Sequence, residues 1–198
     1  MKQLIAKIKA RKILSIMTII TIISLILGTL FISILSKDNK ELITSNVIDF
    51  FTAIKSNNLN YNQILVKSLT NNLLLNIIIW LLGISIIGIP IVIILLFIKS
   101  FILSFTFTSI IYTYKYKGII SAIIYVIPHI INLLLSFVLI YYSITFSKSL
   151  FNYLFKKKEC NRKELVNRYL KLLTISTFLF IISSIIETYI IPILIRLF

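Results

Sequence analysis

The sequence has 198 residues, of which 59% are apolar and 14% charged, and its mean hydropathy is +1.02. A soluble domain is about half apolar and about a quarter charged, so this composition excludes an ordinary globular protein. Intrinsic disorder needs low hydrophobicity, and a disulfide framework needs more than the single cysteine, Cys160. The composition therefore indicates an integral membrane protein with an all-α fold.

The formal net charge of +15 is unevenly distributed along the chain. Residues 1–12 hold five basic and no acidic residues, residues 148–171 hold eight basic and two acidic ones, and residues 36–68 hold four and three. Basic clusters that flank apolar spans orient a membrane protein by remaining on the cytoplasmic side. We therefore expect a cytoplasmic N-terminus at residues 1–12, contact with membrane lipids, and no nucleic-acid partner.

The first charge-free run, residues 13–36, is predicted to be a transmembrane helix. A helix crosses an apolar core of about 30 Å in roughly 20 residues, so one crossing fits this run. A cleaved signal peptide would have an apolar region of roughly 7–15 residues and a small-residue cleavage site. Neither feature is present, so the helix is expected to stay uncleaved.

The remaining apolar sequence lies in residues 69–147 and 172–198. If residues 1–12 lie inside and residues 37–68 outside, the basic loop 148–171 can be inside only after an odd number of crossings. One crossing cannot accommodate residues 69–147, whereas three can. The sequence therefore predicts five transmembrane helices, with the N-terminus cytoplasmic and the C-terminus extracytoplasmic.

The boundary between the second and third helices has two interpretations, because Gly83, Gly88 and Pro90 interrupt the run. In the first, the chain turns at Gly88-Ile-Pro90 and leaves Lys99 inside the bilayer. In the second, a kinked helix continues to Ile98 and the chain turns at Lys99, which leaves too few residues for the third crossing. Proline removes a backbone donor, which favours the first interpretation.

The segment 37–68 contains an amphipathic pattern, with Thr44 or Ser45 as a candidate helix cap and a polar loop over residues 56–62. Its apolar residues recur on one face of a helix: Ile43, Val47, Phe50, Phe51 and Ile54. This short helix either covers the ends of the transmembrane helices or docks a partner on the outer face of the membrane.

The sequence offers no set of residues typical of an enzyme. A membrane zinc protease would need two histidines near a glutamate, and the chain has His129 alone. An intramembrane aspartyl protease would need two buried aspartates, whereas Asp38 and Asp49 both fall in the outer segment. We expect no catalysis, no metal and no cofactor, and we expect Cys160 in the basic loop to be a reduced, idle thiol.

Polar residues within the apolar runs carry more information, because a charge at the bilayer centre costs about 2.5–3.5 kcal/mol. Lys99 and Glu187 are each the sole formal charge in their neighbourhood, and an ion pair between helices is one hypothesis. The other is that each side chain reaches toward the membrane surface. His129, next to Pro128, is expected to bond a neighbouring helix or a carbonyl freed by the proline.

Small residues recur at Ser100, Ser104 and Thr108, one helical turn apart. Such a stripe lets two helix backbones approach closely. The expected role is packing within the bundle, with a subunit interface as the alternative.

Two stretches of the sequence resemble the stage II sporulation protein M family. That family has a Gly-x4-Gly-x-Pro break, then Phe-x-Lys-Gly-Phe-x-x-Gly-Phe, and a Pro-His step. The matching residues here run from Asn71-Asn72 through Trp80-Leu-Leu-Gly83-Ile-Ser-Ile-Ile-Gly88-Ile-Pro90 to Phe97-Ile-Lys99-Ser100-Phe101-Ile-Leu-Ser104-Phe105 and Pro128-His129. Ser100 and Ser104 replace the family's glycines, so a slightly wider helix crossing is expected.

The resemblance implies a non-catalytic membrane protein of a bacterial endospore-former, in which the mother cell engulfs the forespore. Its expected partners are stage II sporulation proteins D and P, which cut peptidoglycan. The implied role is a scaffold that anchors and localises these hydrolases at the septal mother-cell membrane, with segment 37–67 and the loop near Lys115 and Lys117 as contact surfaces.

Two other function classes are considered. A small transporter or permease subunit would place a midplane site at the Gly88–Pro90 break, with Lys99 and Glu187 beside it. A permease-like partner of a cytoplasmic ATPase would use the basic loop 148–171 for coupling. That loop is more simply explained by attraction to anionic lipid headgroups.

Overall fold

The chain folds entirely into helices over the residues that the computed structural model describes, 2–56, 59–156 and 162–197. The all-α prediction is confirmed for these residues, while Cys160 lies outside them. The elements in chain order are α1 (Lys2–Ile34), α2 (Lys37–Lys55), α3 (Tyr61–Leu82), α4 (Gly88–Tyr114), η1 (Lys115–Lys117), α5 (Gly118–Lys156), α6 (Arg162–Ile185), η2 (Ile186–Ile190) and α7 (Ile191–Leu197).

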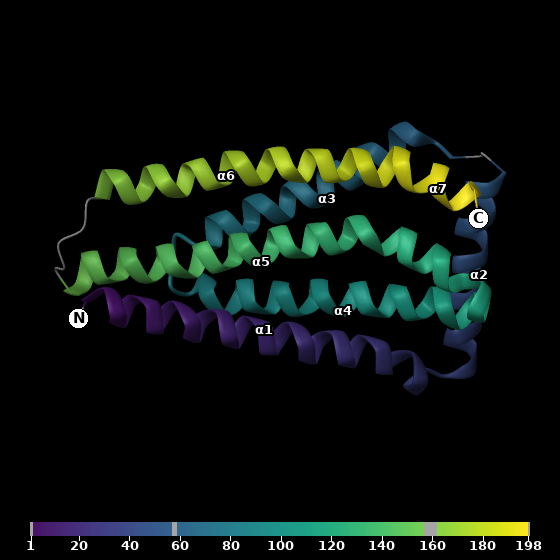
Figure 1. The fold of residues 1–198 in the computed structure, drawn as a ribbon, viewed down its shortest axis with the longest axis horizontal. Coiled ribbons are helices and arrows are strands. Elements are labelled where there is room, and N and C mark those ends of the chain that lie inside the picture. Colours follow the sequence, from purple (N-terminus) through teal and green to yellow (C-terminus); the bar gives the residue numbers. More distant parts are fainter. Residues whose placement is uncertain (1, 57–58, 157–161, 198) are drawn as a thin grey trace.

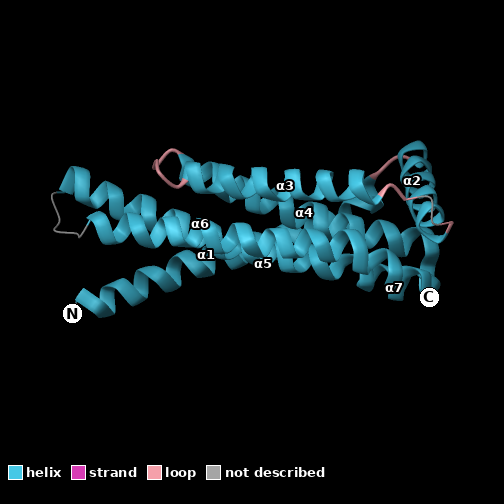
Figure 2. Ribbon diagram, turned by 90° about the horizontal axis from the view of Figure 1, so that it is seen from above, coloured by secondary structure: helices cyan, strands magenta, loops and turns pink. Residues whose placement is uncertain are grey.

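Five long helices run roughly parallel or antiparallel to one another, and α2 lies across one end of them (Figures 1 and 2). Helix α4 packs between α1 and α5, and α6 packs on both α5 and α3. We call the end with α2, η1 and α7 the capped end. The opposite end, which we call the basic end, holds the start of α1, the α3–α4 turn, the end of α5 and the start of α6.

Four stretches of the described residues are long and apolar enough to cross a membrane: Arg11–Ile34, Tyr61–Leu82, Gly88–Phe155 and Lys163–Arg196. The third stretch contains both α4 and α5, and the chain reverses between them at η1. Lys115 has a φ of 52° there, a left-handed backbone that permits the tight reversal. The number of crossings, predicted as five, stays a prediction.

The turn between α3 and α4 lies at residues 83–87, just before the predicted Gly88-Ile-Pro90 turn. Pro90 is the third residue of α4, where its missing N–H leaves no gap in the helix. Helix α4 continues unbroken past Lys99, so the alternative of a turn at Lys99 is wrong. The Gly88–Pro90 segment forms the first turn of α4, directly after the reversal of the chain, and so it is no break within a helix.

Helix boundaries extend beyond the predicted segments. Ser36 caps α2 by accepting a hydrogen bond from the Asn39 N–H, so the predicted caps Thr44 and Ser45 lie inside the helix and are wrong. The predicted basic loop 148–171 is mostly the end of α5 and the start of α6. A helix that is predicted to end at the first charged residue is predicted too short, because Lys, Arg and Glu are good helix formers that continue a helix past the membrane surface.

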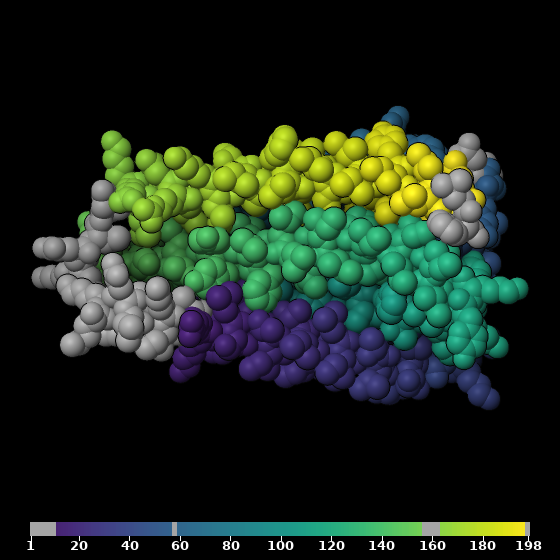
Figure 3. Space-filling view, viewed as in Figure 1, coloured from purple at the N-terminus to yellow at the C-terminus, as the bar shows by residue number. Residues whose placement is uncertain are grey.

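The buried core lies where α1, α3, α4 and α5 meet, around Met17, Ile79, Leu96 and Ile140. Large apolar side chains on the outer faces are exposed, as Ile19, Ile94 and Leu134 illustrate. Figure 3 shows the broad face that α1, α5 and α6 present. An apolar exterior of this kind suits a membrane, because lipid tails are as apolar as the interior of the bundle and apolar side chains can face them without cost.

Candidate functional site

A ladder of polar side chains joins α3 to α6 and η2 among otherwise apolar helices. Ser68, Asn72 and Asn76 recur every four residues along α3, which places them on one face of that helix. Asn76 is fully buried. Sequence reasoning singled out Asn72 only as a motif residue and missed the ladder, although the spacing of four was visible.

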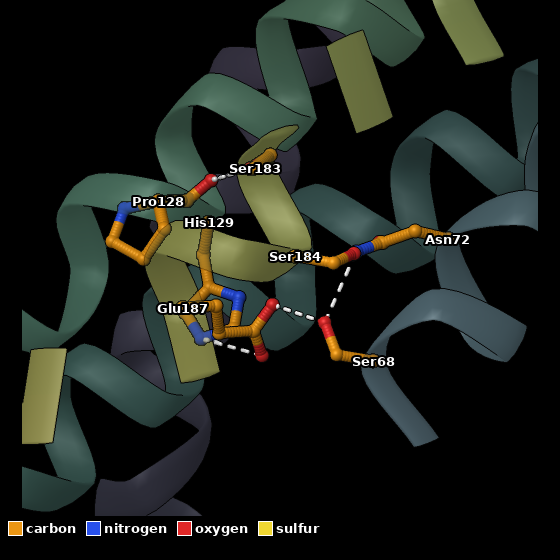
Figure 4. A network of polar contacts seen from close by, with 7 residues as sticks. All are labelled: Ser68, Asn72, Pro128, His129, Ser183, Ser184 and Glu187. Carbon is orange, nitrogen blue, oxygen red and sulfur yellow. Dashed lines mark hydrogen bonds and ion pairs between the residues drawn. The ribbon is translucent and has the colours of Figure 1, made fainter. Parts of the chain in front are cut away.

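Glu187 lies at the capped-end side of this ladder (Figure 4). The Ser68 hydroxyl donates a hydrogen bond of 2.7 Å to Glu187 Oε2. Glu187 Oε1 lies 3.9 Å from His129 Nε2, an ion pair when His129 is protonated. One carboxylate therefore connects α3, η2 and α5.

The backbone at Glu187 has the wider π-helical turn, η2. The Ile191 N–H donates to the Ile186 carbonyl, five residues back instead of four. Pro192 has no N–H to give to the Thr188 carbonyl, which accounts for the local change in the ladder of hydrogen bonds. Such π-bulges often occur at functional sites, and Pro192 was the signal in the sequence that could have located this one.

Further along the ladder, amide side chains of α3 bridge to hydroxyls of α6. Asn72 Nδ2 donates to Ser184 Oγ at 2.9 Å. Asn76 uses both ends of its amide: Nδ2 donates to Thr177 Oγ1 at 2.8 Å and Oδ1 accepts from Ser176 Oγ at 2.8 Å. Hydrogen bonds of this type between membrane helices contribute roughly 0.6–2 kcal/mol each, so the ladder fixes the register of α3 against α6.

The predicted ion pair between Lys99 and Glu187 does not form. Lys99 Nζ donates to Ser136 Oγ at 2.8 Å and stands 5.2 Å from the centre of the Phe180 ring. The side chain opposite Glu187 is His129, so the expected contact of His129 with a neighbouring helix is to a side chain and not to a backbone carbonyl. The Pro128 carbonyl accepts from Ser183 Oγ at 3.5 Å instead (Figure 4).

A polar cavity of about 180 Å³ opens beside these residues, lined by Asn72, Lys99, Tyr125, His129 and Asn132 among others. His129 Nε2 and Asn132 Oδ1 are buried and have no hydrogen-bond partner within the described part of the chain. A cavity of this size with unpaired polar atoms can hold water, which would satisfy both. The arrangement is suited to stabilising polar side chains in the interior of the bundle.

In the described ranges, no group of three or more His, Cys, Asp and Glu residues could hold a metal ion.

The small residues of α4 face α1. Ser100 and Ser104 are buried, and a Cβ placed on Gly28 of α1 would lie 2.1 Å from Ser104 Oγ and 2.5 Å from the Phe101 carbonyl oxygen. The Ser24 hydroxyl of α1 donates to the Phe97 carbonyl of α4. The stripe thus packs within one chain, and the matching pair on α1, Ser24 and Gly28, was missed by sequence reasoning.

Thr108, the third residue of the stripe, is half-buried and donates to the Ser104 carbonyl at 2.9 Å within α4.

Gly83 and Gly88 shape the α3–α4 turn. A Cβ on Gly83 would lie 2.1 Å from Tyr169 Oη and 2.2 Å from Ser143 Oγ, while one on Gly88 would lie 1.9 Å from the Leu82 carbonyl oxygen. Tyr169 donates to the Trp80 carbonyl at 2.8 Å, directly beside Gly83. Both glycines therefore stand where no side chain fits.

The apolar residues proposed for partner docking face the bundle instead. Phe51 and Ile54 are 3% and 1% exposed, and they pack with Val47 against α4, α5 and α7. Phe50 is half-exposed and touches Tyr125, and Ile43 is also half-buried. This face of α2 covers the ends of the long helices, so these five residues do not form a free docking surface.

Arg196 holds α2 in place from the C-terminal end of the chain. Its Nε donates to the Ile54 carbonyl at 2.7 Å, and Nη2 donates to the Tyr61 hydroxyl at 2.7 Å. A cation at the carbonyl end of a helix stabilises the free acceptors and the helix dipole there. Arg196 is a second structural residue that sequence reasoning did not select.

Comparison with known families gives one match. Residues 17–192 match the family described as stage II sporulation protein M. No curated protein and no solved structure matches the chain. The matched region begins in α1 and ends in α7, so it includes the polar ladder, the α1–α4 seam and the α2 cap. Because this match extends over nearly the whole length, the chain belongs to the stage II sporulation protein M family.

Proposed function

We propose that this protein is a non-enzymatic membrane scaffold for forespore engulfment, which anchors peptidoglycan hydrolases at the septal membrane of the mother cell. Family membership makes it a sporulation-related membrane protein. By the family resemblance, its partners are stage II sporulation proteins D and P. One observation supports the proposal beside the family membership. Helix α2 is packed across one end of the helix bundle.

The orientation follows from charge. Residues 1–12 and 148–171 hold most of the basic residues of the chain, and the described parts of both segments lie at the basic end of the bundle. By the positive-inside rule this end faces the cytoplasm, and the capped end faces the compartment in which wall hydrolases work. The C-terminus is then extracytoplasmic.

The docking surface that we propose is a groove of about 340 Å³ between the outward side of α2 and the end of α4. It is lined by Lys37, Lys40, Glu41, Thr44, Ser45, Ile48 and Tyr112. The groove combines charges of both signs with apolar contact area, as interfaces between folded proteins do. The turn at Lys115–Lys117 lies at the same end and extends this surface.

Site-directed photo-crosslinking in sporulating cells tests this surface. A crosslinking residue at Ser45 or Ile48 should capture protein D or P, and one at Asn167, an exposed position on α6 near the basic end, should not. Equal capture from Asn167, or no capture from either α2 position while the protein is at its normal level, would contradict the proposal.

A further inference from the structure

A recess at the basic end is open between α1, α4 and α5. Its volume is about 630 Å³. It is lined by Lys12, Ile13 and Ile16 of α1, by Ile86 and Ile89 around the start of α4, and by Lys148, Phe151 and Asn152 of α5. The recess exists because the α3–α4 turn is set back from this end, while α1 and α5 continue past it (Figures 1 and 2).

The two lysines are brought to the same level by contacts deeper in the bundle. Ser24 bonds to Phe97, which fixes how far α1 extends beyond the start of α4. Ser147 Oγ donates to the Ser85 carbonyl at 2.9 Å, which fixes α5 against the turn, one residue before Lys148. Residues from two separate helices thus present exposed ammonium groups at one recess.

Among the described residues, the side chains that line the recess include two basic ones. No acidic side chain is among the residues that line it, and none lies in the first turn of α4. The walls, in contrast, are apolar: Ile16 is 45% exposed and leads directly onto the outer face of α1. Two cations above apolar walls at a membrane surface match a molecule with an anionic head and hydrocarbon tails.

We propose that this recess binds an anionic phospholipid, with its phosphate between Lys12 and Lys148 and its acyl chains along Ile13, Ile16 and Ile89. Asn152 offers a polar side chain for the rest of the headgroup. A free phosphate ion would leave the apolar walls without a partner, and a neutral lipid would leave the two ammonium groups uncompensated. This site lies at the opposite end of the bundle from the α2 groove, so lipid binding here can be tested independently of the scaffold role.

Lipid binding to the purified full-length chain in a neutral detergent tests the site. Titration with phosphatidylglycerol, followed by native mass spectrometry, should show tighter binding than phosphatidylcholine with the same acyl chains. The double variant Lys12→Gln/Lys148→Gln should weaken phosphatidylglycerol binding by about thirtyfold, at roughly fivefold per lysine. Both side chains are exposed, so the variant is expected to fold, and its circular dichroism checks this.

The matched control is Lys163→Gln/Lys171→Gln, which removes the same charge from exposed positions of α6 at the same end. It should leave phosphatidylglycerol binding within about twofold of the wild type. An equal loss in both double variants would show diffuse attraction to the whole basic end and overturn the site. Equal binding of phosphatidylcholine, or full competition by millimolar inorganic phosphate, would overturn the anionic lipid as its ligand.

Discussion

The seam between α1 and α4 and the seam between α3 and α6 join helices by different chemistry. At the first, Gly28 and Ser104 let the backbones come so close that even one Cβ would clash with the Phe101 carbonyl. At the second, Asn72 and Asn76 bridge a wider separation through side-chain hydrogen bonds. In lipid, helices gain little from burying apolar surface, so close packing and hydrogen bonding are the two means of association.

This difference has a consequence for substitutions. A close-packed seam tolerates no added volume, whereas a hydrogen-bonded seam loses stability in steps as single partners are removed. The hydroxyls of Ser176 and Thr177 also bond to the Leu173 carbonyl in their own helix, so they keep a partner when Asn76 is lost. We therefore expect larger effects at the α1–α4 seam.

Gly28→Leu should have the largest effect, a loss of about 3 kcal/mol in the free energy of unfolding, because overpacking forces the backbones apart. Unfolding of the purified protein in mixed detergent micelles measures this loss. Ile26→Leu, on the lipid-facing side of α1, is the matched control and should change little. Equal stability of the two variants would contradict the close approach of α1 and α4.

Asn76→Leu should cost about 1–2 kcal/mol, because it removes two hydrogen bonds between α3 and α6 while keeping the side-chain volume. The same unfolding measurement applies. Asn71→Leu changes the same chemistry at an exposed position and should be nearly neutral. A neutral Asn76→Leu would mean that the ladder does not stabilise the bundle.

Glu187→Gln should cost about 0.6 kcal/mol, because an amide oxygen still accepts from Ser68 but the charge opposite His129 is lost. The comparison variant is His129→Gln, which removes the other half of the pair. If the losses of unfolding free energy in the two single variants add up to the loss in the double variant, Glu187 and His129 have no interaction energy. That result would refute the connection through Glu187 between α3 and α5.

Lys99→Met should have the smallest effect, within about 0.5 kcal/mol of unfolding free energy, because the lost hydrogen bond to Ser136 is offset by removing a charge from the apolar interior. In cells, a scaffold with this change should support normal engulfment. A transporter that uses the cavity beside Lys99 would lose solute flux, so a loss of flux at a normal protein level would favour that alternative.

The long helices could be predicted from the sequence because lipid imposes a simple rule, namely that a run near 20 residues without charge crosses the membrane. The amphipathic helix over Ile43–Ile54 was visible for a similar reason, since its apolar residues follow the helical period. The periodicity left open whether this face covers the bundle or docks a partner, because it identifies an apolar face and does not identify what covers it.

The polar ladder could be predicted only in part. Lys99, His129 and Glu187 stood out as isolated charges, and the structure gathers them around one region. The contacts of these three side chains did not follow from charge alone. Glu187 faces His129 because of the π turn before Pro192 and because of the position of α5 along the bundle axis. Ser68 and Asn76 are ordinary residue types in a sequence rich in serine and asparagine, so only their spacing separated them from their neighbours, whereas Gly28 is one of four glycines in the chain and could have been noticed.

Fluorescence imaging of engulfment in sporulating cells, with this gene deleted and then restored, tests the scaffold role most directly. We predict that mother-cell membranes stall or bulge at the septum in the deletion strain, that growth stays normal, and that the restored gene rescues engulfment. Normal engulfment in the deletion strain, accompanied by a defect in growth or solute uptake, would contradict the scaffold role.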